Sequence, residues 1–131
     1  MIVVDSSALI EYYRPSGKAN VRKAVAQAIK NDQVAVNGII KAEILAFASG
    51  KKEFLKLSSD FDAFHWLSLK KSDFDLASEL GRVLRKKGIT IPPTDLIIAA
   101  SAIRAKAALY HVDSHYDQVE KYSRLKTKNL S

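Results

Sequence analysis

The chain contains no cysteine. Disulfide frameworks, thiol nucleophiles and thiolate zinc sites are therefore excluded together. The sequence also lacks any run of the roughly 18 uncharged apolar residues that a membrane span requires. Its first residues show neither a basic leader nor a small-residue cleavage site. We therefore expect a cytoplasmic protein without a membrane partner.

No internal repeat, low-complexity stretch or linker interrupts the chain. Apolar residues make up 47% of its 131 positions. A chain of this size can bury roughly two-thirds of the surface that its unfolded form exposes. We therefore expect one globular domain over residues 1–131.

Lysine and arginine are in excess, 21 against 14 aspartates and glutamates, which gives a net charge of +7 and a pI near 9.6. Such an excess favours a polyanionic partner such as RNA or DNA, because each neutralised phosphate releases counterions. The same charge can also do no more than keep a protein soluble. The positions of the acids are needed to decide between these interpretations.

Apolar runs alternate with helical patterns along the chain. The runs predict strands at 1–4, 33–37, 64–69 and 109–112. Helices are expected at 6–13, 18–30, 39–49, 52–62, 73–87 and 95–106, with Ser72 and Thr94 as N-caps of the last two. Residues 113–117 are interpreted as a polar loop that leads into a basic tail. The order predicts an α/β fold, a three-layer sandwich with a short, mainly parallel central sheet.

Four acids stand where such a fold can bring them together. Asp5 and Asp113 follow the first and last strands, and ligands bind beyond the carboxyl ends of parallel strands. Glu43 lies in the helix after the second strand, and Asp95 lies in the first turn of a later helix. Each also has a plainer explanation as a helix cap, a first-turn charge, a solvated residue or a turn former.

The residues around Glu43 and Asp95 are apolar, which indicates burial. Buried carboxylates repel one another and are costly to desolvate unless a cation binds them. Oxygen ligands select Mg²⁺ or Mn²⁺, which can activate water for attack on a phosphodiester. With the four acids neutralised, 21 cations face ten remaining acids, which leaves +11 to hold RNA.

The histidines and two tyrosines have weaker claims to function. No pair among His65, His111 and His115 has the close spacing of a zinc motif, and the first two are interpreted as structural. His115 can touch substrate, although an exposed loop histidine is more often without function. Tyr12 and Tyr13 can stack on bases or simply end a packed helix.

Three segments resemble the acidic motifs of PIN-domain ribonucleases, above all the VapC-type toxins of toxin–antitoxin pairs. They are DSSALIEYY after the first strand, PPTDLIIAASA and HVDSHYD; AEIL around Glu43 adds a weaker match. The resemblance implies an endoribonuclease in which Asp5, Glu43, Asp95 and Asp113 hold Mg²⁺, or Mn²⁺ in its place. Ser7 matches a small polar position that supports the first acid and helps to position substrate.

The same resemblance implies a homodimer that a cognate antitoxin blocks by placing a peptide in the acidic groove. Two segments depart from the usual pattern: NGIIK before Glu43 lacks the common serine and threonine, and Val112 replaces a polar residue. Asp117 can replace or assist Asp113 as the fourth ligand.

Two other classes compete with the nuclease. A non-catalytic RNA-binding or scaffold domain of the same fold would bind RNA without metal-dependent cleavage. A phosphoacceptor signalling domain has a similar length and architecture, but it needs an acidic pair after the first strand and an acceptor aspartate after the third. Here Ser6 follows Asp5, and the third run ends in Ser68-Leu69-Lys70. That class is disfavoured.

Overall fold

Five short parallel strands form the centre of the molecule. The computed structural model describes all 131 residues, and its strands pair in the order β3-β2-β1-β4-β5. Ile2 at the start of the central strand aligns with Val34 on one side and with Ala108 on the other. The strands are β1 (Ile2–Val4), β2 (Val34–Val36), β3 (His65–Trp66), β4 (Ala108–His111) and β5 (Thr127–Asn129).

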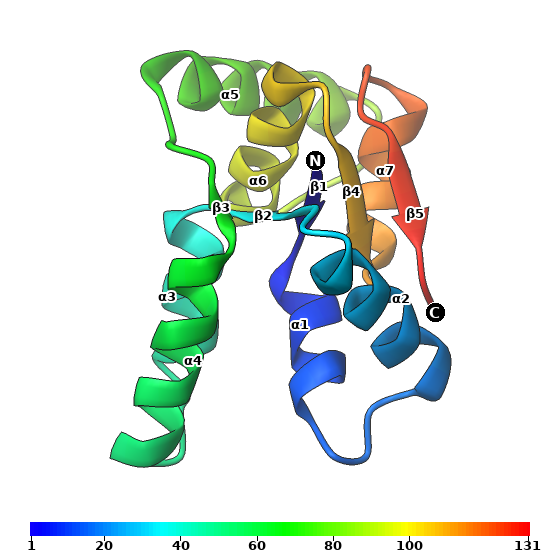
Figure 1. Cartoon of the computed structure of the whole chain (residues 1–131). Coiled ribbons are helices and arrows are strands. Elements are labelled where there is room, and N and C mark those ends of the chain that lie inside the picture. Colours follow the sequence, from blue (N-terminus) through cyan, green and yellow to red (C-terminus); the bar gives the residue numbers. More distant parts are fainter.

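Seven helices accompany the sheet (Figure 1). They are α1 (Ser6–Tyr13), α2 (Ala19–Lys30), α3 (Gly38–Leu45), α4 (Lys51–Ala63), α5 (Lys71–Lys86), α6 (Pro93–Ala105) and α7 (Ser114–Lys121). Helices α3 and α4 lie side by side and extend from the β2–β3 edge, whereas the C-terminus lies near α2. No helix is long and apolar enough to cross a membrane. The predicted α/β class is confirmed, and the sheet is wholly parallel.

The buried strands explain why apolar runs located them. Val3 and Val4 of β1 are fully buried, and all three residues of β2 are buried as well. Because helices cover both faces of the sheet, the central strands need apolar residues at every position and show no alternation. The buried apolar residues form one continuous core of 31 side chains.

The third apolar run and the C-terminal segment differ from the prediction. Only His65 and Trp66 of the third run form a strand, and both are exposed at the edge of the sheet. The segment predicted as a polar loop and a basic tail contains the helix α7 and the strand β5. Helix α7 begins where the Asp113 carboxylate accepts a hydrogen bond from the His115 backbone N–H at 2.9 Å. Strand β5 is polar and pairs through its backbone with β4, so it carries no apolar pattern.

Two predicted N-caps are wrong. Helix α5 begins one residue before Ser72, and the Asp73 carboxylate accepts a hydrogen bond from the Lys70 N–H at 2.9 Å. Helix α6 begins at Pro93 rather than after Thr94. Proline suits this first position because its fixed φ is helical and its missing N–H would have no partner there.

An ion pair between the buried Asp73 and the partly exposed Arg104 joins α5 to α6, the helix that carries Asp95. Both carboxylate oxygens of Asp73 accept hydrogen bonds from Arg104, at 2.7 and 3.0 Å. Burial by itself would raise the pKa of Asp73, but hydrogen bonds from Arg104 and from the Lys70 N–H lower it overall. The pair therefore keeps the two helices in a defined relation while Asp73 stays ionised.

Candidate metal centre

Asp5 occupies the carboxyl end of the central strand and is almost completely buried, with 3% of its surface exposed. Its Oδ1 accepts hydrogen bonds from the Ser7 hydroxyl at 2.7 Å and from the Ala8 N–H at 3.2 Å. Asp5 therefore caps α1, as its plainer explanation required. Burial, and to a smaller extent the charge of Asp95, raises the pKa of Asp5 to about 6. A cap alone needs no such burial, so the site holds a carboxylate that lacks a counter-charge.

Ser7 connects the ends of β1 and β4. Its hydroxyl donates to Asp5 and accepts the Val112 backbone N–H at 3.1 Å. Val112 immediately precedes Asp113, so a single side chain bridges the two strand ends that carry acids. The support of the first acid expected for Ser7 is therefore visible as a direct contact.

Asp95 and Asp113 lie on either side of His115. The His115 Nδ1 is 2.9 Å from Asp95 Oδ2 and 3.4 Å from Asp113 Oδ1. One ligand atom from each of the three residues lies within 4.8 Å of the others. These side chains are partly buried, with exposed fractions of 16% for Asp95, 34% for Asp113 and 40% for His115. Such a group can hold a divalent cation.

Glu43 reaches the site from α3. Its Oε1 accepts a hydrogen bond from the Ser6 hydroxyl at 2.7 Å, which ties α3 to the first residue of α1. Helix α3 is itself set by Asn37, whose side chain accepts hydrogen bonds from two N–H groups of its first turn. The partly buried Glu43 is thus oriented by a residue next to Asp5 in sequence.

Tyr116 lies beside Asp95 in the interior of the site. Its hydroxyl is 3.4 Å from Asp95 Oδ1, and the side chain is fully buried. Burial raises the pKa of Tyr116, and the charges of the four acids (Asp5, Asp95, Glu43 and Asp113) raise it further. The charges of all four predicted acids thus act on one buried hydroxyl, whereas the group of ligand atoms that lie within 4.8 Å of one another includes Asp95 and Asp113 but neither Asp5 nor Glu43.

The donor set fits a hard divalent cation. None of the four acids forms a salt bridge with a lysine or arginine, and the bases beside them are two histidines, His115 and the buried His111. Oxygen ligands without a protein counter-ion are the surroundings that Mg²⁺ and Mn²⁺ bind. The group around His115 can therefore bind a divalent cation.

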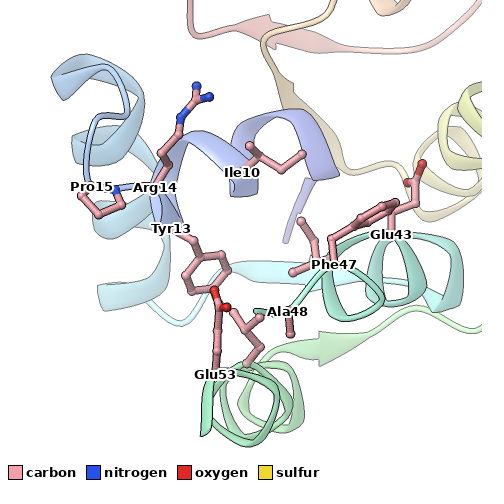
Figure 2. Close-up of a pocket in the computed structure, with 10 residues that line it drawn as sticks. Ile10, Tyr13, Arg14, Pro15, Glu43, Phe47, Ala48 and Glu53 are labelled. Carbon is pink, nitrogen blue, oxygen red and sulfur yellow. The ribbon is translucent and has the colours of Figure 1, made fainter. Parts of the chain in front are cut away.

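A largely apolar pocket of about 410 Å³ adjoins Glu43. In Figure 2, Ile10 and Tyr13 of α1 lie across the opening from Phe47 and Ala48, which connect α3 to α4. Phe47 is 86% exposed, an unusual state for a large apolar side chain. The acidic cluster thus continues into an apolar surface.

The other candidates take different positions. The Asp117 carboxylate accepts a hydrogen bond from the Asn129 side chain at 2.9 Å and is not part of the group around His115. His111 is buried, and its Nδ1 accepts the Asp113 N–H at 3.1 Å, whereas His65 contacts Asp32 at the far sheet edge. Tyr12 and Tyr13 pack against the core at the end of α1.

Sequence reasoning missed Tyr116 and Ser6, and it gave His115 too little weight. All three are adjacent to motif residues: Ser6 follows Asp5, and the segment HVDSHYD contains both His115 and Tyr116. A helical start at Asp113 was the available signal, because it places the next two residues beside the first turn of α7.

Comparison with known proteins gives a consistent result. The PIN domain family model matches residues 2–122. Ribonuclease VapC11 of Mycobacterium tuberculosis is 29% identical over 135 residues, with 99% of each chain covered. The structure of VapBC2 from Rickettsia felis, bound to a DNA fragment from their promoter, has a TM-score of 0.75 at 21% identity and covers 100% of both chains. A toxin-antitoxin complex from Klebsiella pneumoniae has a TM-score of 0.72 at 17% identity and covers 87% of this chain and 88% of that one.

At these identities the solved structures show a shared fold. The family match spans nearly the whole chain and includes all four acids. The resemblance to VapC-type proteins drawn from the motifs is confirmed by these relatives. The chain belongs to the PIN domain family.

Proposed function

We propose that this protein is a Mg²⁺-dependent endoribonuclease that hydrolyses RNA phosphodiesters in the cytoplasm, as the toxin of a toxin–antitoxin pair. The observation that carries the proposal is the environment of Asp5. This carboxylate is only 3% exposed and has no cationic partner, and the charge of Asp95 raises its pKa further. Buried carboxylates of this kind need a bound cation to remain ionised together.

Asp5, Glu43, Asp95 and Asp113 would hold the metal. When bound, Mg²⁺ would supply an activated water for in-line attack and would stabilise the leaving oxygen of the phosphodiester. The hydroxyls of Ser7 and Ser6 orient the first two acids, at 2.7 Å in both cases. Such outer contacts keep the oxygens in place and thereby favour one arrangement of ligands.

The charge of the rest of the chain suits a nucleic acid. With four acids neutralised, 21 cations face ten acids. RNA rather than DNA is proposed as substrate because the relative at 29% identity is named a ribonuclease. The RNA-binding alternative differs in one respect only, since it would hold RNA in a salt-dependent way without cutting it.

The antitoxin partner is proposed from the VapBC complexes and from the pocket beside Glu43. A segment of the antitoxin would place apolar side chains between Ile10 and Phe47 and a cation toward the acids. Burial of exposed side chains such as Phe47 would contribute most of the affinity. The homodimer implied by the resemblance remains a prediction. The molar mass of the purified protein in solution, from light scattering, tests it.

Cleavage of a fluorescent RNA by purified protein tests the function. We expect cutting with Mg²⁺ or Mn²⁺, none in EDTA, and a loss of at least about a thousandfold in Asp5→Asn and in Asp95→Asn. Asp75→Asn, which changes an exposed acid on α5, is the matched control and keeps its activity. Equal cleavage by the Asp5→Asn protein would assign the activity to a contaminant or to another site. RNA binding without cleavage would support the non-catalytic alternative.

A further inference from the structure

The imidazole of His115 contacts two of the acids through the same ring nitrogen. Its Nδ1 lies 2.9 Å from Asp95 Oδ2 and 3.4 Å from Asp113 Oδ1. The backbone N–H of His115 donates to the same Asp113 oxygen at 2.9 Å, so ring and carboxylate are held by one helix start. A ring nitrogen is therefore fixed beside two carboxylate oxygens.

We propose that His115 Nδ1 is itself a metal ligand and that it makes the centre prefer Mn²⁺ to Mg²⁺. The inference rests on the proposed function, because it concerns the same metal. Ligand atoms about 2.1 Å from an octahedral ion lie about 3.0 Å from their neighbours. The two separations from Nδ1, 2.9 and 3.4 Å, are close to that spacing.

The nature of the ligand gives the direction of the preference. Mg²⁺ binds carboxylates and waters at near-ideal octahedral positions and rarely accepts other donors. Imidazole nitrogen is a softer donor than carboxylate oxygen and suits transition metals, of which Mn²⁺ binds nitrogen the least strongly. Mn²⁺ still accepts imidazole more readily than Mg²⁺ does, because it is larger and less firmly hydrated. A set of carboxylates alone discriminates less between Mg²⁺ and Mn²⁺, so His115 is the residue that sets the preference.

A purely structural role makes a different prediction. If His115 only donates a hydrogen bond to Asp95, it remains outside the metal shell, and its removal changes both metal affinities by a similar factor. If His115 coordinates the metal, its removal takes away one ligand, and this loss weakens the binding of Mn²⁺ more than that of Mg²⁺. The two roles therefore differ in the ratio of the affinities and in the atoms bonded to the metal.

Electron paramagnetic resonance of Mn²⁺ added to the full chain tests the proposal without any activity assay. We expect nitrogen hyperfine coupling from a directly bonded imidazole in the wild type and its loss in His115→Ala. The ratio of Mn²⁺ to Mg²⁺ affinity, from competition titrations, should fall on the order of tenfold. His115→Asp restores an oxygen ligand, so it should bind Mg²⁺ about as tightly as the wild type while the nitrogen coupling stays absent.

His65→Gln is the control, because this exposed histidine contacts Asp32 far from the acids. It should keep both the coupling and the affinity ratio. His115 is 40% exposed, and thermal unfolding of its variants checks that they are folded. Mn²⁺ bound by the wild type without nitrogen coupling would overturn the role of His115 and leave the proposed function intact. Failure of the wild type to bind either metal would refute both.

Discussion

Replacing Asp5 by asparagine should make the metal-free protein more stable at neutral pH. Burial raises the pKa of Asp5 from its ordinary value of 3.8 to about 6. At about 1.36 kcal/mol per pH unit, this difference corresponds to about 3 kcal/mol. Because the folded state favours the neutral acid, the stability is complete below pH 3.8 and is lost as the pH rises through 6. Asparagine has no charge to lose, and its Oδ1 can keep both hydrogen bonds of the cap.

Thermal unfolding in EDTA between pH 4 and pH 8 measures this effect. The Asp5→Asn protein should equal the wild type at pH 4 and exceed it at pH 8 by about 10 °C, at about 3 to 4 °C per kcal/mol for a chain of this size. Asp75→Asn, at an exposed position, should change stability by less than about 0.5 kcal/mol at both values.

Adding metal should cancel most of the variant's advantage at pH 8. Mg²⁺ at about a hundred times its dissociation constant stabilises the binding protein by about 2.7 kcal/mol, and the Asp5→Asn variant should gain much less. An advantage of the variant that is the same at pH 4 and pH 8, or no advantage at pH 8, would refute the reasoning. A variant destabilised at every pH would mean that asparagine does not reproduce the cap hydrogen bonds of Asp5, and it would contradict the expected gain as well.

Three further substitutions test parts of the structure. Arg104→Ala should lower the free energy of unfolding in urea by about 3 to 5 kcal/mol, because it leaves a buried carboxylate unpaired. Arg82→Ala, at an exposed pair, should cost less than about 1 kcal/mol. Equal losses in the two variants would contradict this. Gly17→Ala should lower stability by about 1 to 3 kcal/mol, since the added Cβ would lie 1.8 Å from a backbone oxygen, and Gly50→Ala, with open space, should be nearly neutral in the same assay. Ser7→Ala should weaken Mn²⁺ binding by calorimetry about 10- to 100-fold with the fold retained, and an unchanged affinity would exclude a role in orienting the first acid.

Elements with a strong apolar pattern could be predicted from the sequence. Strand β1 and helix α5 are examples: one is a short run buried on both faces, and the other has Leu80 and Leu84 on one side. The pattern failed for α7 and β5, where the stabilising contacts are a cap at Asp113 and backbone pairing with β4. Such contacts depend on the tertiary structure and leave little trace in local hydrophobicity.

The proximity of Asp5 and Asp113 could be predicted from the order of the strands. Asp5 and Asp113 follow strands whose carboxyl ends share one edge, so topology alone brings them near each other. Their supporting contacts could not be predicted, because Ser6 and Glu43 are 37 positions apart and Ser7 and Val112 are 105 apart. Spacing along the chain carries no information about pairs of that kind.

Helical spacing does not predict how Asp113 and Asp117 lie relative to each other. Residues four apart share a face only when both are helical. Asp113 is the N-cap of α7, with an extended φ of −120° and ψ of 120°, so its carboxylate turns back toward His115. Asp117, one turn into the helix, accepts a hydrogen bond from Asn129 beside β5 instead. The residue at which the helix begins therefore places Asp113 beside His115, and the hydrogen bond from Asn129 keeps Asp117 out of that group.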